Sequence, residues 1–169
     1  AGLRTSTGEI YFGGIDGFTR FVPLEFPVDT TPPQVVITDL LISNQPALPS
    51  WRDPDSPLHK IVGYTDSLTL TYQQSIFSFE FAGLHFAEPS KNRYQYMLEG
   101  FDGDWVGTDA SRRHATYTHL NSGNYLFRVR AANRDGVYSD VEAQVVVSIL
   151  PPPWKTWWAY LLYVTAATT

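Results

Sequence analysis

Four histidines are the first residues of this sequence that could bind a metal or transfer a proton: His59, His85, His114 and His119. A catalytic zinc site usually shows clustered ligands, such as His-Glu-x-x-His, because the ion needs several protein ligands at once. No such spacing occurs here, and the absence of cysteine removes thiolate ligands and nucleophiles. We therefore expect histidines at the surface or at strand edges, and neither a metal nor a cofactor.

Two pairs of aspartates could bind an ion or act as general acid and base. Asp102 and Asp104 form an Asp-Gly-Asp sequence, but calcium takes about six to eight oxygen ligands and this loop supplies only a pair of carboxylates. Asp53 and Asp55 could flank a glycosidase cleft. Because prolines interrupt that stretch, a surface loop is the simpler interpretation. We expect both pairs to lie in turns.

Asp109, Ser111 and His114 carry the side chains of a hydrolytic triad. A serine nucleophile of the common hydrolase type sits in a Gly-x-Ser-x-Gly elbow that exposes its hydroxyl. No elbow surrounds Ser111. The sequence therefore predicts no catalytic residue, and we expect the chain not to be an enzyme.

The composition limits the remaining functions. The 169 residues are 43% hydrophobic and 17% charged, which is too apolar for a disordered chain. A net charge of -5 disfavours binding to nucleic acid or to an anionic membrane, since both need a basic surface. Five arginines lie close together in the sequence, and we expect them to pair with the acidic surplus rather than with phosphate. They are Arg112, Arg113, Arg128, Arg130 and Arg134.

Alternating residues predict the strands that must position these side chains. In Ile76–Ala82 the three phenylalanines Phe77, Phe79 and Phe81 fall on one face, which is the pattern of a half-buried strand. Further strands are predicted at Val35–Ile42, Leu68–Tyr72, Tyr94–Leu98, Arg113–Thr118, Tyr125–Ala131 and Ala143–Ile149. About seven short strands separated by turns predict an all-β, immunoglobulin- or fibronectin-III-like two-sheet sandwich.

Two aromatic residues receive specific places in this sandwich. Residues 120–136 resemble the sixth strand and following turn of fibronectin type III domains. In that resemblance Tyr125 is the tyrosine-corner residue, whose hydroxyl bonds back to the chain upstream. Trp105 follows a turn and is predicted to be the bulky side chain that fills the space between the sheets.

The two ends of the chain differ from the sandwich. Residues 9–22 read as two short strands around a Gly-rich turn, which is one hairpin, and Pro27, Pro32 and Pro33 mark a connector. The predicted boundaries are 1–24 for the hairpin, 25–33 for a linker, 34–150 for the sandwich and 151–169 for a Pro-rich exit. After Lys155 no charged residue occurs, so the exit is interpreted as the first part of a transmembrane helix. The alternative is an apolar helix that packs on the sandwich.

Three stretches, 75–105, 115–120 and 123–136, together resemble the three-tyrosine domain of bacterial two-component regulators. Tyr96, Tyr117 and Tyr125 are the positions that match its name. Residues 8–18 resemble the closing motif of the β-propeller repeats that precede this domain, which makes the hairpin a remnant of the last propeller blade. Residues 150–160 resemble the approach of the family to its membrane helix.

The resemblance implies a periplasmic module, next to the bacterial inner membrane, in a single-pass sensor whose output is a histidine kinase, often hybrid, or a diguanylate cyclase. Its partners would be its own propeller domain and membrane helix, a second copy in a homodimer, and an oligosaccharide bound mainly outside this chain. The residues expected to couple the sandwich to the membrane are Pro151, Pro152, Pro153 and Trp154, and those expected to anchor it are Trp157, Trp158 and Tyr160.

An alternative from another class is a carbohydrate-binding β-sandwich module. Exposed tyrosine and tryptophan rings can stack on sugars, and the aromatic content of 15% makes such rings available. This alternative needs no membrane segment, and it predicts sugar affinity in the isolated domain.

Overall fold

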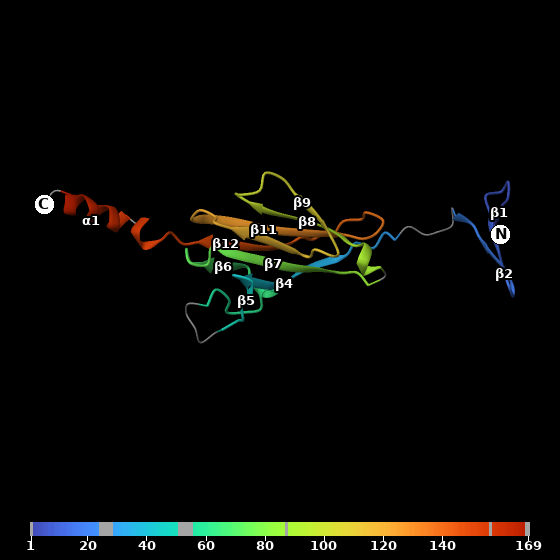
Figure 1. The fold of residues 1–169 in the computed structure, drawn as a ribbon, viewed down its shortest axis with the longest axis horizontal. Helices are drawn as coiled ribbons and strands as arrows, with labels where there is room; N and C mark the ends of the chain where they lie inside the picture. Colours follow the sequence, from blue (N-terminus) through green and yellow to red (C-terminus); the bar gives the residue numbers. More distant parts are fainter. Residues whose placement is uncertain (1, 24–28, 51–55, 87, 156, 168–169) are drawn as a thin grey trace. The chain divides into compact units, whose positions relative to one another are not determined.

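The computed structural model is built almost entirely of strands (Figure 1), as the sequence predicted. It describes residues 2–23, 29–50, 56–86, 88–155 and 157–167. The chain divides into two compact units, Ala1–Thr30 and Thr31–Thr169. Part of the predicted linker lies outside the described residues. Asp53 and Asp55 lie outside them as well, so the prediction made for that pair stays a prediction.

The first unit is a three-stranded antiparallel sheet in the order β1-β2-β3. Its strands are β1 (Gly2–Arg4), β2 (Ile10–Gly14) and β3 (Gly17–Phe21). The predicted hairpin is present as β2 and β3, and a third strand that the sequence analysis missed, β1, precedes it. The turn between β1 and β2 is closed by a hydrogen bond from the Gly8 amide to the Thr5 carbonyl at 3.1 Å. Gly8 adopts a φ of 87°, which glycine reaches without steric cost.

The second unit is the predicted sandwich of two sheets, seen one above the other in Figure 1. One sheet has the order β10-β7-β4-β5, and the other has the order β6-β12-β11-β8-β9. The strands are β4 (Gln34–Ile42), β5 (Gln45–Pro46), β6 (Ser67–Leu70), β7 (Ile76–Leu84), β8 (Arg93–Glu99), β9 (Val106–Asp109), β10 (His114–Thr118), β11 (Gly123–Ala132) and β12 (Ala143–Ile149). The sequence analysis missed β5 and β9, which are short and largely exposed and so lack an alternating pattern.

Helical structure is confined to short segments. Among the residues that the structure describes are the 3₁₀ turns η2 (Val62–Tyr64), η3 (Pro89–Lys91) and η4 (Pro153–Lys155), and the α-helix α1 covers Trp157–Ala167. No helix among the residues that the structure describes is long and apolar enough to cross a membrane. The 11 residues of α1 extend about 16 Å at 1.5 Å per residue, whereas the hydrocarbon core of a bilayer is about 30 Å thick.

The core lies between the two sheets and is built from the predicted inward faces. Phe77, Phe79 and Phe81 of β7 are buried, and so is Phe127 of β11 in the opposite sheet. The rings of Phe79 and Phe127 stack with their centres 4.5 Å apart, so aromatic contact joins the sheets directly. The alternation of strands β7 and β11 therefore predicted the core correctly.

Trp105 does not fill the space between the sheets, and this prediction was wrong. It lies partly exposed on the outer face of the five-stranded sheet, where the guanidinium carbon of Arg130 is 4.2 Å from its ring centre and that of Arg128 is 5.4 Å away. Both arginines point outward from β11 because they alternate with the buried Phe127 and Val129. The phenylalanines and Tyr117 already occupy the interior that Trp105 was expected to fill.

Truncating Trp105 should therefore cost little stability. We expect Trp105→Ala to lower the free energy of unfolding by about 0.5–2 kcal/mol, the range of a cation–π contact that is partly open to water. Phe79→Ala is the control and should cost about 3–5 kcal/mol, since it removes a fully buried ring. Urea unfolding followed by circular dichroism measures both, and equal losses would contradict the outer position of Trp105.

Asp102 closes one end of the sandwich through its carboxylate. The Oδ2 atom accepts a hydrogen bond from the Leu98 amide at 2.8 Å and another from the Tyr117 hydroxyl at 2.9 Å. Leu98 belongs to β8 and Tyr117 to β10, so one carboxylate links strands of opposite sheets. Burial, and then the charge and hydrogen bond of Asp102, raise the pKa of the Tyr117 hydroxyl far above its usual value. The pKa of Tyr96 is also raised, by burial and by the charge of Asp102.

Removing the Tyr117 hydroxyl should destabilise the domain. At neutral pH we expect Tyr117→Phe to cost about 1.5–3 kcal/mol, because the partly buried Asp102 carboxylate loses one of its donors. Unfolded tyrosine ionises near pH 10 and folded Tyr117 only well above it, so its contribution is present below about pH 10 and declines as the pH rises further. Denaturant unfolding at neutral and alkaline pH measures this. The link between Tyr117 and Asp102 would be contradicted if Tyr117→Phe were as stable as the original chain at neutral pH and lost the same stability at alkaline pH.

Candidate functional site

Pairing with β6 fixes the position at which β12, the last strand of the sandwich, ends. Strand β12 pairs in parallel with β6 up to Ile149 and Leu70, and the Leu150 amide then donates to the Leu70 carbonyl at 2.9 Å. β6 ends at Leu70, two residues before the predicted end, because the chain turns there. The Gln74 side-chain oxygen accepts the Thr71 amide at 2.9 Å, and the Gln74 amide donates to the Thr71 carbonyl at 3.0 Å.

This turn places Tyr72 against the segment that leaves the sandwich. The rings of Tyr72 and Trp154 meet edge to face, with centres 5.0 Å apart and planes at 75°. Trp154 lies in η4, where the Lys155 amide donates to the Pro152 carbonyl at 2.9 Å. The predicted coupling residues Pro151–Trp154 are therefore held to the domain at both ends of the proline run. The sequence analysis missed Tyr72, because only the early end of β6 directs it toward Trp154.

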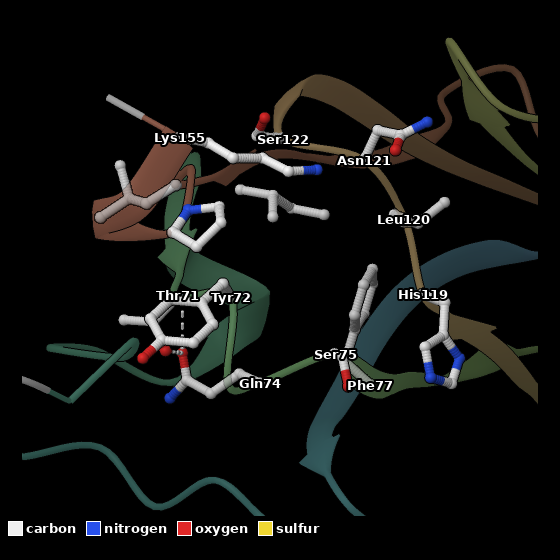
Figure 2. A pocket seen from close by; sticks show the side chains of 13 residues that line it. Thr71, Tyr72, Gln74, Ser75, Phe77, His119, Leu120, Asn121, Ser122 and Lys155 are labelled. Carbon is white, nitrogen blue, oxygen red and sulfur yellow. Dashed lines mark hydrogen bonds between the residues drawn. The ribbon is translucent and has the colours of Figure 1, made fainter. Parts of the chain in front are cut away.

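A pocket of about 240 Å³ lies between this exit segment and two turns of the sandwich (Figure 2). One wall comes from the 71–77 stretch and a second from residues 119–122, and the third is formed by Ile149, Leu150, Pro152 and Lys155. The side chains of the first wall are Thr71, Tyr72, Gln74, Ser75 and Phe77. Strand β10 ends at Thr118 because His119 adopts a left-handed φ of 54°, and the His119 amide donates to the Ser75 carbonyl at 2.9 Å. The 119–122 turn is thereby fixed across the pocket from Tyr72.

The pocket lining carries positive charge without a carboxylate. Lys155 is the cationic side chain of the lining, while the remaining polar groups are the His119 ring, hydroxyls, amides and the phenol of Tyr72. In Figure 2, Lys155 runs along the edge where Ser122 and Asn121 lie, and Tyr72 and Gln74 lie at the opposite edge. Lys155 forms no ion pair with any residue that the structure describes. This arrangement suits a small anionic group.

The three family tyrosines do not line this pocket; they lie in the hydrophobic core of the sandwich or pack against it. Tyr117 is buried, and Tyr96 and Tyr125 are partly buried around it. The Tyr125 hydroxyl donates to the Asn121 carbonyl at 3.0 Å, which is the upstream bond predicted for a tyrosine corner. Because this bond fixes the 119–122 turn, Tyr125 supports the pocket without lining it.

The predicted anchoring residues project from α1. Trp157, Trp158 and Tyr160 have exposed fractions of 77%, 46% and 56%. These large apolar rings lie at the beginning of the helix, next to Lys155. Such a cluster is typical of the belt where a membrane helix meets the lipid headgroups.

The residues with catalytic side chains are held in turns and strands. Within the described part of the chain, no three histidines, aspartates or glutamates gather as metal ligands would. The Ser111 hydroxyl donates to Asp109 at 2.5 Å, which holds the pKa of that carboxyl below its usual value, but no hydrogen bond within the described residues joins His114 to either. The Asp104 carboxylate accepts the Trp105 amide at 2.7 Å.

The prediction that the clustered arginines pair with acidic residues is confirmed for Arg128 and Arg134, whereas Arg130 donates to the side-chain oxygen of Gln95. Arg128 bridges Glu99 and Glu142, and the Glu142 pair has an N–O distance of 2.6 Å. Arg134 contacts Glu88 at 2.6 Å. These carboxylates raise the pKa of both guanidinium groups, which keeps the pairs charged.

The contact between Tyr72 and Trp154 should determine how firmly η4 is held. We expect Tyr72→Ala to speed hydrogen exchange of the Lys155 amide by about two- to tenfold, since an aromatic pair contributes about 0.5–1.5 kcal/mol. Tyr72→Phe keeps the ring and serves as the control. Amide exchange by NMR measures the effect, and unchanged exchange in Tyr72→Ala would contradict an anchoring role.

Known proteins resemble this chain over most of its length. It is 34% identical over 161 residues, or 95% of the chain, to histidine kinase P4 of Formosa agariphila, of which it spans 12%. Crystal structures of the extracellular domain of BT4673 from B. thetaiotaomicron, described once as a one-component and once as a hybrid two-component system, match with a TM-score of 0.63. Their sequence identities are 32% and 33%, they cover 89% and 92% of this chain, and the chain covers 20% of each.

A further structure supports the fold alone. The extracellular domain of the hybrid two-component system BT3049 of B. thetaiotaomicron is 24% identical and matches 89% of this chain and 20% of its own, with a TM-score of 0.64. The sequence pattern of the Y_Y_Y domain matches residues 85–150, which include the three tyrosines identified from the sequence. Residues 85–150 are therefore a Y_Y_Y domain, and the chain around them resembles extracellular domains of two-component systems.

Proposed function

We propose that this chain is the periplasmic juxtamembrane module of a membrane-bound two-component sensor, and that it relays movement to a transmembrane helix. The observation that carries the proposal is the fixed exit of β12, held by the Leu150–Leu70 hydrogen bond and by Trp154 on Tyr72. The likeness to extracellular domains of hybrid two-component systems supports the location outside the cytoplasm. The chain itself is proposed to be non-catalytic.

The first unit supports a propeller on the input side. Its three strands and the turn between β2 and β3 leave large apolar side chains exposed: Leu3 at 65%, Phe12 at 50%, Ile15 at 103% and Phe18 at 73%. A propeller blade has four strands and packs its faces against the neighbouring blades. We infer that this sheet completes the last blade of a propeller domain, which would bind an oligosaccharide mainly outside this chain.

The last segment supports a membrane on the output side. The sequence of α1 has no charged residue on any side of the helix, which is typical of a helix surrounded by protein core or lipid. Its exposed Trp157 and Trp158 would lie at the headgroups, and the span would continue beyond α1. In a homodimer, rotation of one sandwich against the other would move the two helices, because the proline run leaves little slack. The output would be a histidine kinase or a diguanylate cyclase.

A carbohydrate-binding module has less support. Trp105 is a large aromatic residue on the outer sheet face, but the guanidinium carbon of Arg130 lies over its ring, 4.2 Å from the ring centre. A sugar could stack on this ring face only by displacing the arginine.

The relay is tested in the full-length sensor. A flexible Gly-Ser insert between Pro153 and Trp154 should abolish most ligand-dependent output, because movement of the sandwich would no longer reach the helix. An insert of equal length after Gly136, in a surface turn, is the control and should leave output intact. Unchanged ligand-dependent output with the insert after Pro153 would reject the relay.

A further inference from the structure

We propose that the pocket beneath Lys155 binds a phosphate group, which then bridges the exit segment and the Asn121–Ser122 turn. The phosphate could belong to an anionic lipid headgroup or to a free phosphate ester, since both present the same charged oxygens. The lipid source rests on the proposed position next to a membrane, whereas the chemistry of the pocket does not.

The charge of the pocket is the first argument. The chain as a whole carries a net charge of -5, and Arg128, Arg134 and Lys91 are each paired with carboxylates. Lys155 has no acidic partner among the described residues, and no carboxylate lines the pocket. A bound anion would therefore gain an ion pair without competing with an existing one.

The hydrogen-bonding groups are the second argument. The ammonium group of Lys155 offers three donors and the Ser122 hydroxyl offers one. The Ser122 hydroxyl forms no hydrogen bond with the described residues. The turn that carries it is already fixed through the Tyr125 hydroxyl and the Asn121 carbonyl, so binding would cost little ordering of the backbone.

The size of the pocket selects a small group. Pockets for drug-sized ligands have volumes of about 300–1,000 Å³, and this pocket has about 240 Å³. A phosphate or a headgroup fits such a volume, whereas an oligosaccharide does not.

The consequence would be regulation of the exit. Lys155 belongs to η4, directly after Trp154, while Ser122 belongs to the turn between β10 and β11. A phosphate held by both would add a second link from η4 to the sandwich, beside the Tyr72–Trp154 contact. Occupancy of the pocket would stiffen the connection between sandwich and helix.

Two binding measurements on this chain separate the sources of phosphate. Inorganic phosphate is titrated while the amide resonances of Ser122 and Lys155 are followed by NMR. Partition is then compared between vesicles of phosphatidylcholine alone and vesicles that also contain phosphatidylglycerol. We expect saturable shifts with phosphate and tighter partition to the anionic vesicles, which phosphate reduces by competition.

The variants separate a built pocket from general attraction. Lys155→Ala and Ser122→Ala should each weaken phosphate binding about fivefold or more, since each removes a donor to a charged ligand. Lys155→Arg should retain binding. Lys60→Ala, which removes an equal charge that does not line this pocket, is the control and should bind like the original chain.

Each outcome decides the proposal. Phosphate-induced shifts that depend on Lys155 and Ser122 support it. Vesicle binding with the same dependence identifies a lipid headgroup as the source. Phosphate binding without such vesicle binding identifies a free phosphate ester. Loss of binding in Lys155→Ala without any effect of Ser122→Ala would overturn the pocket, and so would the lack of saturable shifts. These readouts do not involve receptor output, so a failed relay would leave them unchanged.

Discussion

The parallel pairing of β6 with β12 is the constraint on which the exit end of this domain depends. It fixes the last strand at Ile149 and Leu150, and the turn that ends β6 brings Tyr72 to Trp154. Without this pairing, β12 would be an edge strand, and the direction of the proline run that follows it would not be fixed. A stiff proline segment transmits movement only when its first residue is itself held.

Polar groups that could do chemistry serve the architecture instead. The Asp102 carboxylate joins β8 and β10 across the sheets, and the Tyr125 hydroxyl holds the turn that borders the pocket. Two of the three tyrosines that give the family its name therefore act through a hydroxyl that closes an end of the sandwich. The third, Tyr96, contributes its ring to the core, where it packs with Phe81 and Phe127.

Trp105 illustrates where sequence reasoning failed. Its size and its place after a turn suggested a buried plug, and nothing in its neighbouring residues indicated otherwise. The outcome depended on arginines some twenty-five positions away, whose guanidinium groups cover the ring on the outer face. Similarly, β9 and the first strand β1 escaped prediction, because exposed pairing strands carry no alternating pattern.

The sequence by itself determined the all-β sandwich, the inward faces of its long strands, the tyrosine corner and the apolar exit. The strands, their faces and the exit follow from period-two burial and local composition, which neighbouring residues carry, whereas the tyrosine corner followed from the resemblance of residues 120–136 to fibronectin type III domains. Only the tertiary structure decided the link from Tyr117 to Asp102, the contact of Tyr72 with Trp154, and the pocket beside Lys155. Each joins residues far apart in the chain, and their meeting depends on strand order and register, which local patterns do not encode.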